Sequence, residues 1–220
     1  MFSTSHIAAV LVILGVCILM YVLKSEIRGK GTKKFRLSLA AILIFQEVSF
    51  QIWSITTGLW SVKYTLPLQL CSITTILTAV LLVTKSKKLY EVIYFWGIGG
   101  AIQALLTPEI GIYTYPHFRY FEFFIAHGTI IAGCLFMTFV EGYRPKLKSV
   151  WKSMIVLNIY ALFVGIFNKI VGANYMFLCA KPEVSSIMDI LGPWPFYIAT
   201  LEIVAVVFFL ILYLPFTFSP

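Results

Sequence analysis

The sequence predicts an all-α polytopic membrane protein in which seven transmembrane helices form a single domain, residues 1–220. Hydrophobic residues make up 60% of the chain, and its mean hydropathy is +0.92. Charged residues make up only 12%, about half of the roughly 25% that is usual in soluble domains. Aromatic residues reach 16%, which suits helices anchored by rings at the two membrane interfaces.

Apolar windows close to the ~20 residues needed to cross a bilayer recur along the whole chain. The connections between these windows are short, so they leave no room for a separate soluble domain. The seven predicted spans cover about residues 5–23, 37–57, 66–84, 89–107, 120–140, 151–171 and 194–214.

Several spans carry local signals of their own. The first has no basic region before it and no small-residue cleavage site after it, so we expect a retained helix and not a removed signal peptide. Pro67 suits the first turn of the third span. The fourth span contains a glycine-rich run, residues 97–100, which predicts a small face for close helix packing. Pro193 and Pro195 rigidify the entry to the last span.

The basic residues predict the orientation of the chain. The first, third and fifth connections carry Lys24, Arg28, Lys30, Lys33, Lys34, Arg36, Lys85, Lys87, Lys88, Arg144, Lys146, Lys148 and Lys152, whereas the other three hold Lys63, Arg119 and Lys181. Because basic loops stay on the cytoplasmic side, we expect the N-terminus outside and the C-terminus in the cytoplasm of a multi-pass cell-membrane protein. The net charge of +8 then indicates contact with anionic lipids, and no nucleic-acid partner is expected.

The four cysteines do not form a metal or disulfide motif. Cys17, Cys71, Cys134 and Cys179 show no CxxC or CxxH spacing, which argues against a zinc site and a disulfide framework. We expect no metal and no organic cofactor.

Two chemically active residues fall at the same expected depth. Cys71 lies about five residues into the third span, roughly 8 Å below the outer boundary at the helical rise of 1.5 Å per residue. His127 lies about seven residues into the fifth span, roughly 10 Å down. Both spans enter from the predicted outer side, so the two side chains are expected to share a level of the bundle.

Further polar residues are concentrated in the outer halves of the predicted spans, whereas the inner halves are nearly bare of ionisable groups. Polar groups in hydrocarbon usually face the bundle interior, a partner or a water-filled cavity. We therefore expect one polar cavity that opens toward the outer side. Its predicted lining includes Glu47, Gln51, Gln69, Gln103 and Glu202.

Cysteine and histidine at one depth permit nucleophilic catalysis, in which the imidazole takes the thiol proton and the thiolate attacks an acyl carbonyl. Glu202 and Glu47 are the candidate residues for orienting the imidazole. Gln51, Gln69 and Gln103 are candidate donors to the oxyanion. From spacing alone, a small buried cysteine and a hydrogen-bonded packing histidine remain the simpler interpretation.

Other functions stay open at this stage. Glu47, His127 and Glu202 also fit a proton relay or coupling-ion site in a transporter of small solutes. A non-catalytic membrane component would pair these polar groups with one another. A retinal-type light sensor does not fit, because the last span contains no lysine to hold a Schiff base.

The sixth connection is rich in polar and aromatic residues. We interpret it as an ordered lid at the headgroup level, because Trp and Tyr favour that interface. The lid residues expected to bind a lipid headgroup are Asn174, Tyr175, Trp194 and Tyr197.

Five segments together resemble the YwaF-like bacterial integral membrane proteins, a seven-span family. They are "LPLQLCSI", "YFWGIGGAIQALLTPE", "FRYFEFFIAHG", "NYMFLCAKP" and "DILGPWPFY", in this order between about residues 37 and 205. That family is distantly similar to a eukaryotic seven-span acyltransferase that remodels ether phospholipids. It is more remotely similar to androgen-induced hydrolases that cleave branched fatty-acid esters.

The resemblance implies a cysteine and histidine pair that acts on lipid acyl groups within the membrane, and the matching positions are Cys71 in "LPLQLC" and His127 in "AHG". The sequence therefore favours acyl transfer or hydrolysis on a membrane lipid by a thiol-dependent acyltransferase or hydrolase. A small-solute or proton-coupled transporter and a non-catalytic component are the alternatives.

Overall fold

The computed structural model describes residues 3–29, 31–181 and 187–218, and all regular structure in these ranges is helical. The helices are α1 (Thr4–Val22), α2 (Lys24–Ile27), α3 (Thr32–Thr56), α4 (Leu70–Thr84), α5 (Lys87–Leu106), α6 (Phe118–Phe139), α7 (Leu147–Val171) and α8 (Phe196–Tyr213), with short 3-10 turns at Tyr175–Phe177, Ile187–Leu191 and Leu214–Phe216. Pro182, at the end of the "NYMFLCAKP" segment, lies outside the described residues.

Six helices are long and apolar enough to cross a membrane: α1, α3, α5, α6, α7 and α8 with its terminal turn. Each coincides with a span expected from the sequence, which confirms a multi-pass helical membrane protein. The remaining expected span, the third, corresponds to α4, which has only 15 residues. At 1.5 Å per residue this helix covers about 22 Å, short of the ~30 Å hydrocarbon core. A full crossing by α4 therefore stays a prediction.

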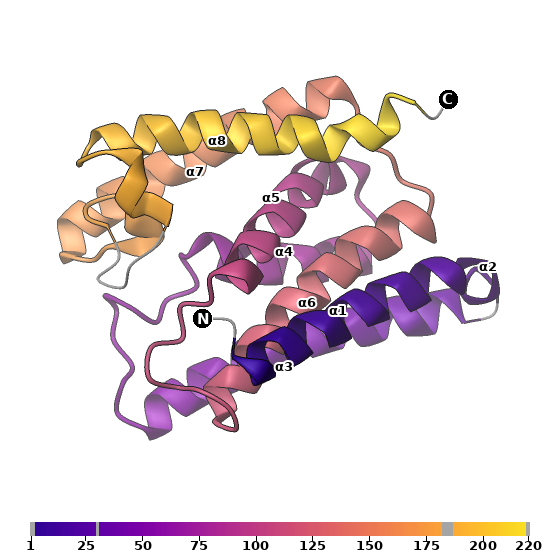
Figure 1. Ribbon diagram of the computed structural model, residues 1–220, viewed down its shortest axis with the longest axis horizontal. Helices are drawn as coiled ribbons and strands as arrows, with labels where there is room; N and C mark the ends of the chain where they lie inside the picture. Colours follow the sequence, from indigo (N-terminus) through magenta and orange to yellow (C-terminus); the bar gives the residue numbers. More distant parts are fainter. Residues whose placement is uncertain (1–2, 30, 182–186, 219–220) are drawn as a thin grey trace.

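Three helices form the interior of the bundle. Figure 1 shows α7 and α8 along one flank and α1 with α3 along the other, with α4, α5 and α6 between them. α5 and α6 are the most enclosed, whereas α1 and α8 bury few residues and present apolar side chains outward. An apolar outer face suits contact with lipid tails, because lipid tails are as apolar as leucine.

Glycines bring the central helices into close contact. A Cβ atom at Gly97 of α5 would lie 2.7 Å from the Cys134 sulfur and 3.0 Å from Ile130 Cγ2, both on α6. A Cβ atom at Gly133 of α6 would lie 2.8 Å from Thr78 Cγ2 of α4. The small face expected from the glycine-rich run is therefore used for packing at Gly97.

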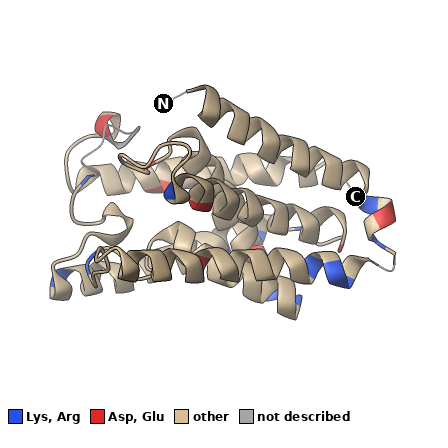
Figure 2. Ribbon diagram, turned by 90° about the horizontal axis from the view of Figure 1, so that it is seen from below, with Lys and Arg blue, Asp and Glu red and all other residues tan. Residues whose placement is uncertain are grey.

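The basic connections meet at one end of the bundle. Figure 2 shows Lys and Arg gathered toward the end at which α2 lies. There the Arg28 guanidinium donates to the carbonyls of Phe139 and Val140 at the end of α6. Glu141 pairs with Lys85 at 2.5 Å and with Arg36 at 3.4 Å. The first, third and fifth connections thus share one side, and which side faces the cytoplasm stays a prediction.

The contacts of Gly97 predict the effect of adding one methyl group. Gly97→Ala forces the Cys134 sulfur or the helix to shift, and overpacking of this kind costs about 1–3 kcal/mol of unfolding free energy. Gly100→Ala is the matched control on the same helix, because its nearest contact would be an ordinary 3.9 Å. Thermal unfolding in detergent should show a lower midpoint for Gly97→Ala only. Equal midpoints for the two variants would contradict the packing described here.

Candidate functional site

The contacts of Gly97 set the register of the three central helices. Its Cβ position lies 3.0 Å from Ile130 Cγ2 on α6 and 3.5 Å from Thr74 Cγ2 on α4. These three residues therefore lie at one level of the bundle. α4 and α6 run in the same direction and α5 runs oppositely, so three residues back along α4 and α6 correspond to three residues forward along α5.

That step of about one helical turn leads from the Gly97 level to Cys71, Gly100 and His127. The Cys71 sulfur lies 3.9 Å from the position of a Cβ atom on Gly100. Gly100 carries no side chain, so at this level α5 contributes only backbone, while α4 contributes the Cys71 thiol and α6 the His127 imidazole. No hydrogen bond joins Cys71 to His127 among the described residues.

Cys71 is the second residue of α4, because the helix begins later than the sequence suggested. The predicted third span starts at residue 66, but the residues before Leu70 are not helical, and Pro67 therefore lies outside the first turn that we expected it to occupy. The physical reason is a set of competing contacts. The Gln69 side-chain oxygen accepts from the Met176 N–H at 2.8 Å, and the Leu66 N–H donates to the Tyr175 hydroxyl.

His127 is buried, with 7% of its surface exposed. Its Nδ1 lies 2.7 Å from the Phe123 carbonyl oxygen, and its ring packs on the Phe123 ring at 4.2 Å. Since a carbonyl can only accept, Nδ1 carries the proton and the neutral ring keeps its lone pair on Nε2. Within the described part of the chain, no hydrogen bond is assigned to Nε2. The orienting group in this structure is the Phe123 carbonyl, which no side-chain pattern could reveal.

The two carboxylates expected to orient His127 have other partners. Glu202 of α8 accepts from the Asn158 side chain of α7 at 2.9 Å. Glu47 of α3 accepts from the Gln51 amide at 3.0 Å. Their roles in the site stay predictions.

Glu47 belongs to a charge cluster, defined as Glu47, Arg119 and Glu122, at the facing sides of α3 and α6. The Arg119 guanidinium donates to the Glu122 carboxylate and lies 4.4 Å above the centre of the Phe50 ring. Glu47 is close enough to interact electrostatically with both other members. The sequence pattern predicts Arg119 as a loop residue, and Glu122 is not among the predicted site residues. The available signal was their opposite charge at i, i+3 spacing.

The three glutamines predicted to face substrate also have protein partners. Gln51 donates to the Thr65 carbonyl at 2.8 Å and accepts from the Trp60 indole at 3.1 Å. Gln103 donates to the Thr107 hydroxyl at 3.2 Å. The Gln69 side-chain oxygen accepts from the Met176 N–H of the sixth connection, as described above. Each amide therefore has a structural role in addition to any contact with a ligand.

The sixth connection is held together by its own polar residues. The Asn174 side-chain oxygen accepts from the N–H groups of Cys179 and Ala180. The Trp194 indole donates to the Leu178 carbonyl at 3.1 Å, and the Tyr197 hydroxyl donates to the Phe177 carbonyl. The indole contact leaves Trp194 57% exposed, so its ring is available at the surface.

Tyr175 ties the sixth connection to the second. It is fully buried, and its hydroxyl donates to the Val62 carbonyl at 2.8 Å and accepts from the Leu66 N–H at 2.9 Å. Burial raises the pKa of Tyr175, while the bond from Leu66 lowers it in part. The phenol therefore stays neutral at ordinary pH and can both donate and accept. Of these two hydrogen bonds to the backbone, the one from Leu66 lies five residues before Cys71.

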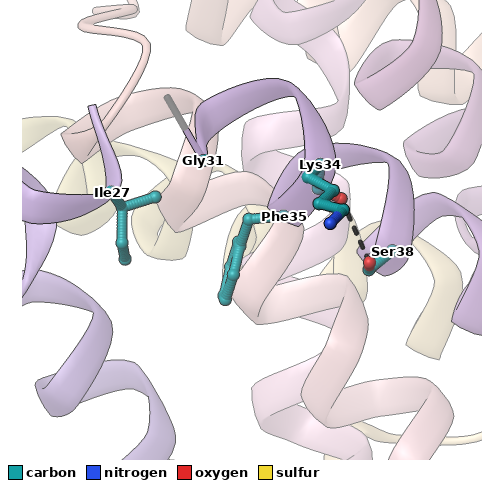
Figure 3. Close-up of a pocket in the computed structure, with 5 residues that line it drawn as sticks. All are labelled: Ile27, Gly31, Lys34, Phe35 and Ser38. Atoms are coloured by element: carbon teal, nitrogen blue, oxygen red, sulfur yellow. Dashed lines mark hydrogen bonds between the residues drawn. The ribbon is translucent and has the colours of Figure 1, made fainter. Parts of the chain in front are cut away.

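Two surface hollows lie away from these residues. Figure 3 shows the one at the basic end, where Ile27, Gly31, Lys34, Phe35 and Ser38 line an open groove and the Ser38 hydroxyl donates to the Lys34 carbonyl. The other lies between α1 and α5, lined by His6, Ile7, Val10, Leu11, Leu105 and Leu106. Neither is lined by Cys71 or His127, so the outward-opening polar cavity stays a prediction. Among the described residues, no three His, Cys, Asp or Glu side chains form a metal-binding group.

Comparison with known proteins gives one match. The model of the TMEM164 family matches residues 1–213 of the chain. No curated protein matches the chain. No protein of solved structure matches it either.

Removing the buried Tyr175 hydroxyl should destabilise the fold, because it breaks the hydrogen bonds between the sixth and second connections. Tyr175→Phe leaves the Leu66 N–H and the Val62 carbonyl without their partner and should lower the free energy of unfolding by about 1–3 kcal/mol. Tyr64→Phe is the control, because Tyr64 is 72% exposed. Chemical unfolding in detergent compares the two variants. A loss of the same size in both would show that the tie does not stabilise the fold.

Proposed function

The chain belongs to the TMEM164 family of membrane proteins, and from this premise we propose that it transfers or hydrolyses acyl groups of a membrane lipid, with Cys71 as nucleophile and His127 as general base. The proposal is carried by the helix register at Gly97, which contacts Thr74 of α4 and Ile130 of α6 and so implies that Cys71 and His127, each three residues earlier, share one level. The resemblance to the YwaF-like proteins supports the same pair.

The protonation state of His127 supports its role as the base. Its Nδ1–H is held by the Phe123 carbonyl, which leaves the Nε2 lone pair to accept the thiol proton. In catalytic triads an acidic side chain accepts the Nδ1–H of the histidine. In this chain the Phe123 carbonyl accepts it. Hydrogen bonds between base and nucleophile are often long without substrate and shorten in the complex, so the missing bond between Cys71 and His127 is compatible with the role.

The position of Cys71 in the first turn of α4 also favours a thiolate. The free N–H groups of a helix N-terminus stabilise negative charge nearby. Burial opposes the thiolate, since a charge in an apolar region is costly. A base within the membrane is therefore needed, and His127 is the imidazole at that level.

The proposed reaction has two balanced steps. The His127 Nε2 takes the proton of Cys71, and the sulfur attacks the ester carbonyl of a lipid. The carbon–oxygen ester bond breaks, the departing lipid oxygen takes the proton from His127, and an acyl thioester remains on Cys71. Attack by water or by the hydroxyl of a second lipid then releases the acyl group and restores the thiol.

The surroundings of the pair suit a lipid substrate at the outer side of the cell membrane. We place the basic end of the bundle in the cytoplasm and the sixth connection at the outer headgroups, in accordance with the positive-inside rule. The exposed indole of Trp194 would contact the headgroup there. The hydrogen bonds of Asn174, Tyr175 and Tyr197 would keep that surface ordered.

The charge cluster of Glu47, Arg119 and Glu122 favours a second function. Glu47 and Glu122 lie within predicted spans and Arg119 lies next to the start of one, and ionisable groups within spans often mark proton or ion pathways. A proton-coupled transporter of small solutes is therefore the alternative.

Labelling with a lipid-like acyl probe tests the enzyme. In purified protein, a long-chain p-nitrophenyl ester should acylate Cys71, and Cys71→Ala should abolish this. His127→Gln should slow acylation by about 10²–10⁴-fold, the usual contribution of a general base. The controls are Cys134→Ala and His117→Asn, which should acylate at the wild-type rate. The proposal would be rejected if the wild-type protein were not acylated, or if His127→Gln were acylated at the wild-type rate.

Proton flux tests the alternative. In proteoliposomes that enclose a pH-sensitive dye, a transporter should carry protons down an imposed gradient, and Glu122→Gln should abolish the flux. Glu26→Gln, at an exposed carboxylate outside the cluster, should leave it unchanged. An enzyme without transport activity should show no protein-dependent flux in any of the three samples.

A further inference from the structure

Two threonine hydroxyls in the interior of the bundle have no hydrogen-bond partner among the described residues. They are Oγ1 of Thr74 and of Thr78, both on α4, and the two residues are 1% and 0% exposed. Neighbouring threonines bond to the preceding turn instead: Thr75 donates to the Cys71 carbonyl at 2.9 Å. A buried hydroxyl without a partner destabilises a fold, and each such group calls for a specific explanation.

Thr74 lies on the same face of α4 as Cys71. Residues three apart on a helix are neighbours, and helical side chains lean toward the N-terminal turn. The Thr74 side chain therefore leans toward the turn that carries the thiol. Its methyl group faces α5, 3.5 Å from the Cβ position of Gly97. Its hydroxyl is buried in the bundle and has no hydrogen-bond partner in the described part of the chain. Thr74 itself lies about one helical turn from Cys71.

We propose that the Thr74 hydroxyl is a further catalytic group, which donates a hydrogen bond to the oxyanion formed when Cys71 attacks a lipid ester. This inference rests on the proposed acyl chemistry of Cys71 and His127. Opposite the thiol, the Cβ position of Gly100 lies 3.9 Å from the Cys71 sulfur, and a glycine there allows a ligand to approach the backbone closely. The unpaired hydroxyl is thus preorganised for a charge that appears only during the reaction.

The glutamines predicted for this role are less well placed. The Gln69 side chain is held toward the outer loop by the Met176 N–H. The Gln103 amide donates to Thr107. Thr74 and Thr78 are both buried and unpaired on the face of Cys71, and Thr74 is the one that lies a single helical turn from the thiol.

The proposed step conserves atoms, electrons and protons. As the Cys71 sulfur bonds to the ester carbon, the electron pair of the carbonyl double bond moves onto its oxygen. The Thr74 O–H donates to that oxygen without transferring its proton. When the double bond re-forms, the lipid alkoxide leaves with the proton held by His127, and the Thr74 hydroxyl is unchanged.

Two reagents for the Cys71 thiol separate this role from a structural one. Acylation by a long-chain p-nitrophenyl ester passes through an oxyanion, whereas alkylation by a long-chain iodoacetamide does not. Thr74→Val removes the hydroxyl and keeps the shape, so it should slow acylation by about 10²–10³-fold, the usual loss of one oxyanion donor. Alkylation of Cys71 should continue at the wild-type rate, which also shows that the variant is folded. Thr74→Ser should retain most of the acylation rate.

Thr78→Val is the matched control. Thr78 is equally buried and unpaired, but seven residues place it roughly 10 Å along the helix from Cys71. The acylation rate of Thr78→Val should equal that of the wild type.

Equal acylation by Thr74→Val and wild type would overturn the inference and leave the proposed function standing. A parallel fall in acylation and alkylation would also overturn it, as a structural effect. A wild-type protein that is alkylated but never acylated would overturn the proposed function and this inference together.

Discussion

Close packing of α4, α5 and α6 through Gly97 and Gly133 is the constraint on which the rest of the structure depends. Without a hydrophobic force between helices in a bilayer, association relies on close contact of small residues. A Cβ atom at either glycine would lie within 3 Å of a side chain on the neighbouring helix. The helices therefore have one register, and that register places Cys71, Gly100 and His127 at one level.

The second and sixth connections set where α4 begins. The Tyr175 hydroxyl and the Gln69 side chain bond to backbone groups across the second and sixth connections. These bonds hold the residues before Leu70 out of the helix and bring Cys71 into its first turn. The sixth connection thus helps to position Cys71, although none of its residues needs to touch a reacting atom.

Several of the charged groups described above lie beside groups of opposite charge. Glu141 pairs with Lys85 and Arg36 at the basic end, and Arg119 pairs with Glu122 near the other end. An isolated charge in hydrocarbon is costly, and the contacts of Glu141 with Lys85 and Arg36 also connect the ends of α3, α4 and α6. Against this background the unpaired Thr74 hydroxyl and the Nε2 lone pair of His127 stand out as groups available to a substrate.

The sequence by itself determined the membrane class, six long spans and the clustering of the basic connections, because these follow from hydropathy and charge along the chain. It also suggested Cys71 and His127, because equal depth follows from the helical rise. Only the tertiary structure decided the start of α4, the orienting Phe123 carbonyl, the pairing of Arg119 with Glu122 and the unpaired state of Thr74. The start of α4 and the unpaired state of Thr74 depend on which atoms of different segments meet, and spacing along one helix does not specify how that helix rotates against another. The Phe123 and Glu122 contacts lie within α6, where they depend on side-chain rotamers that the packing around the helix selects.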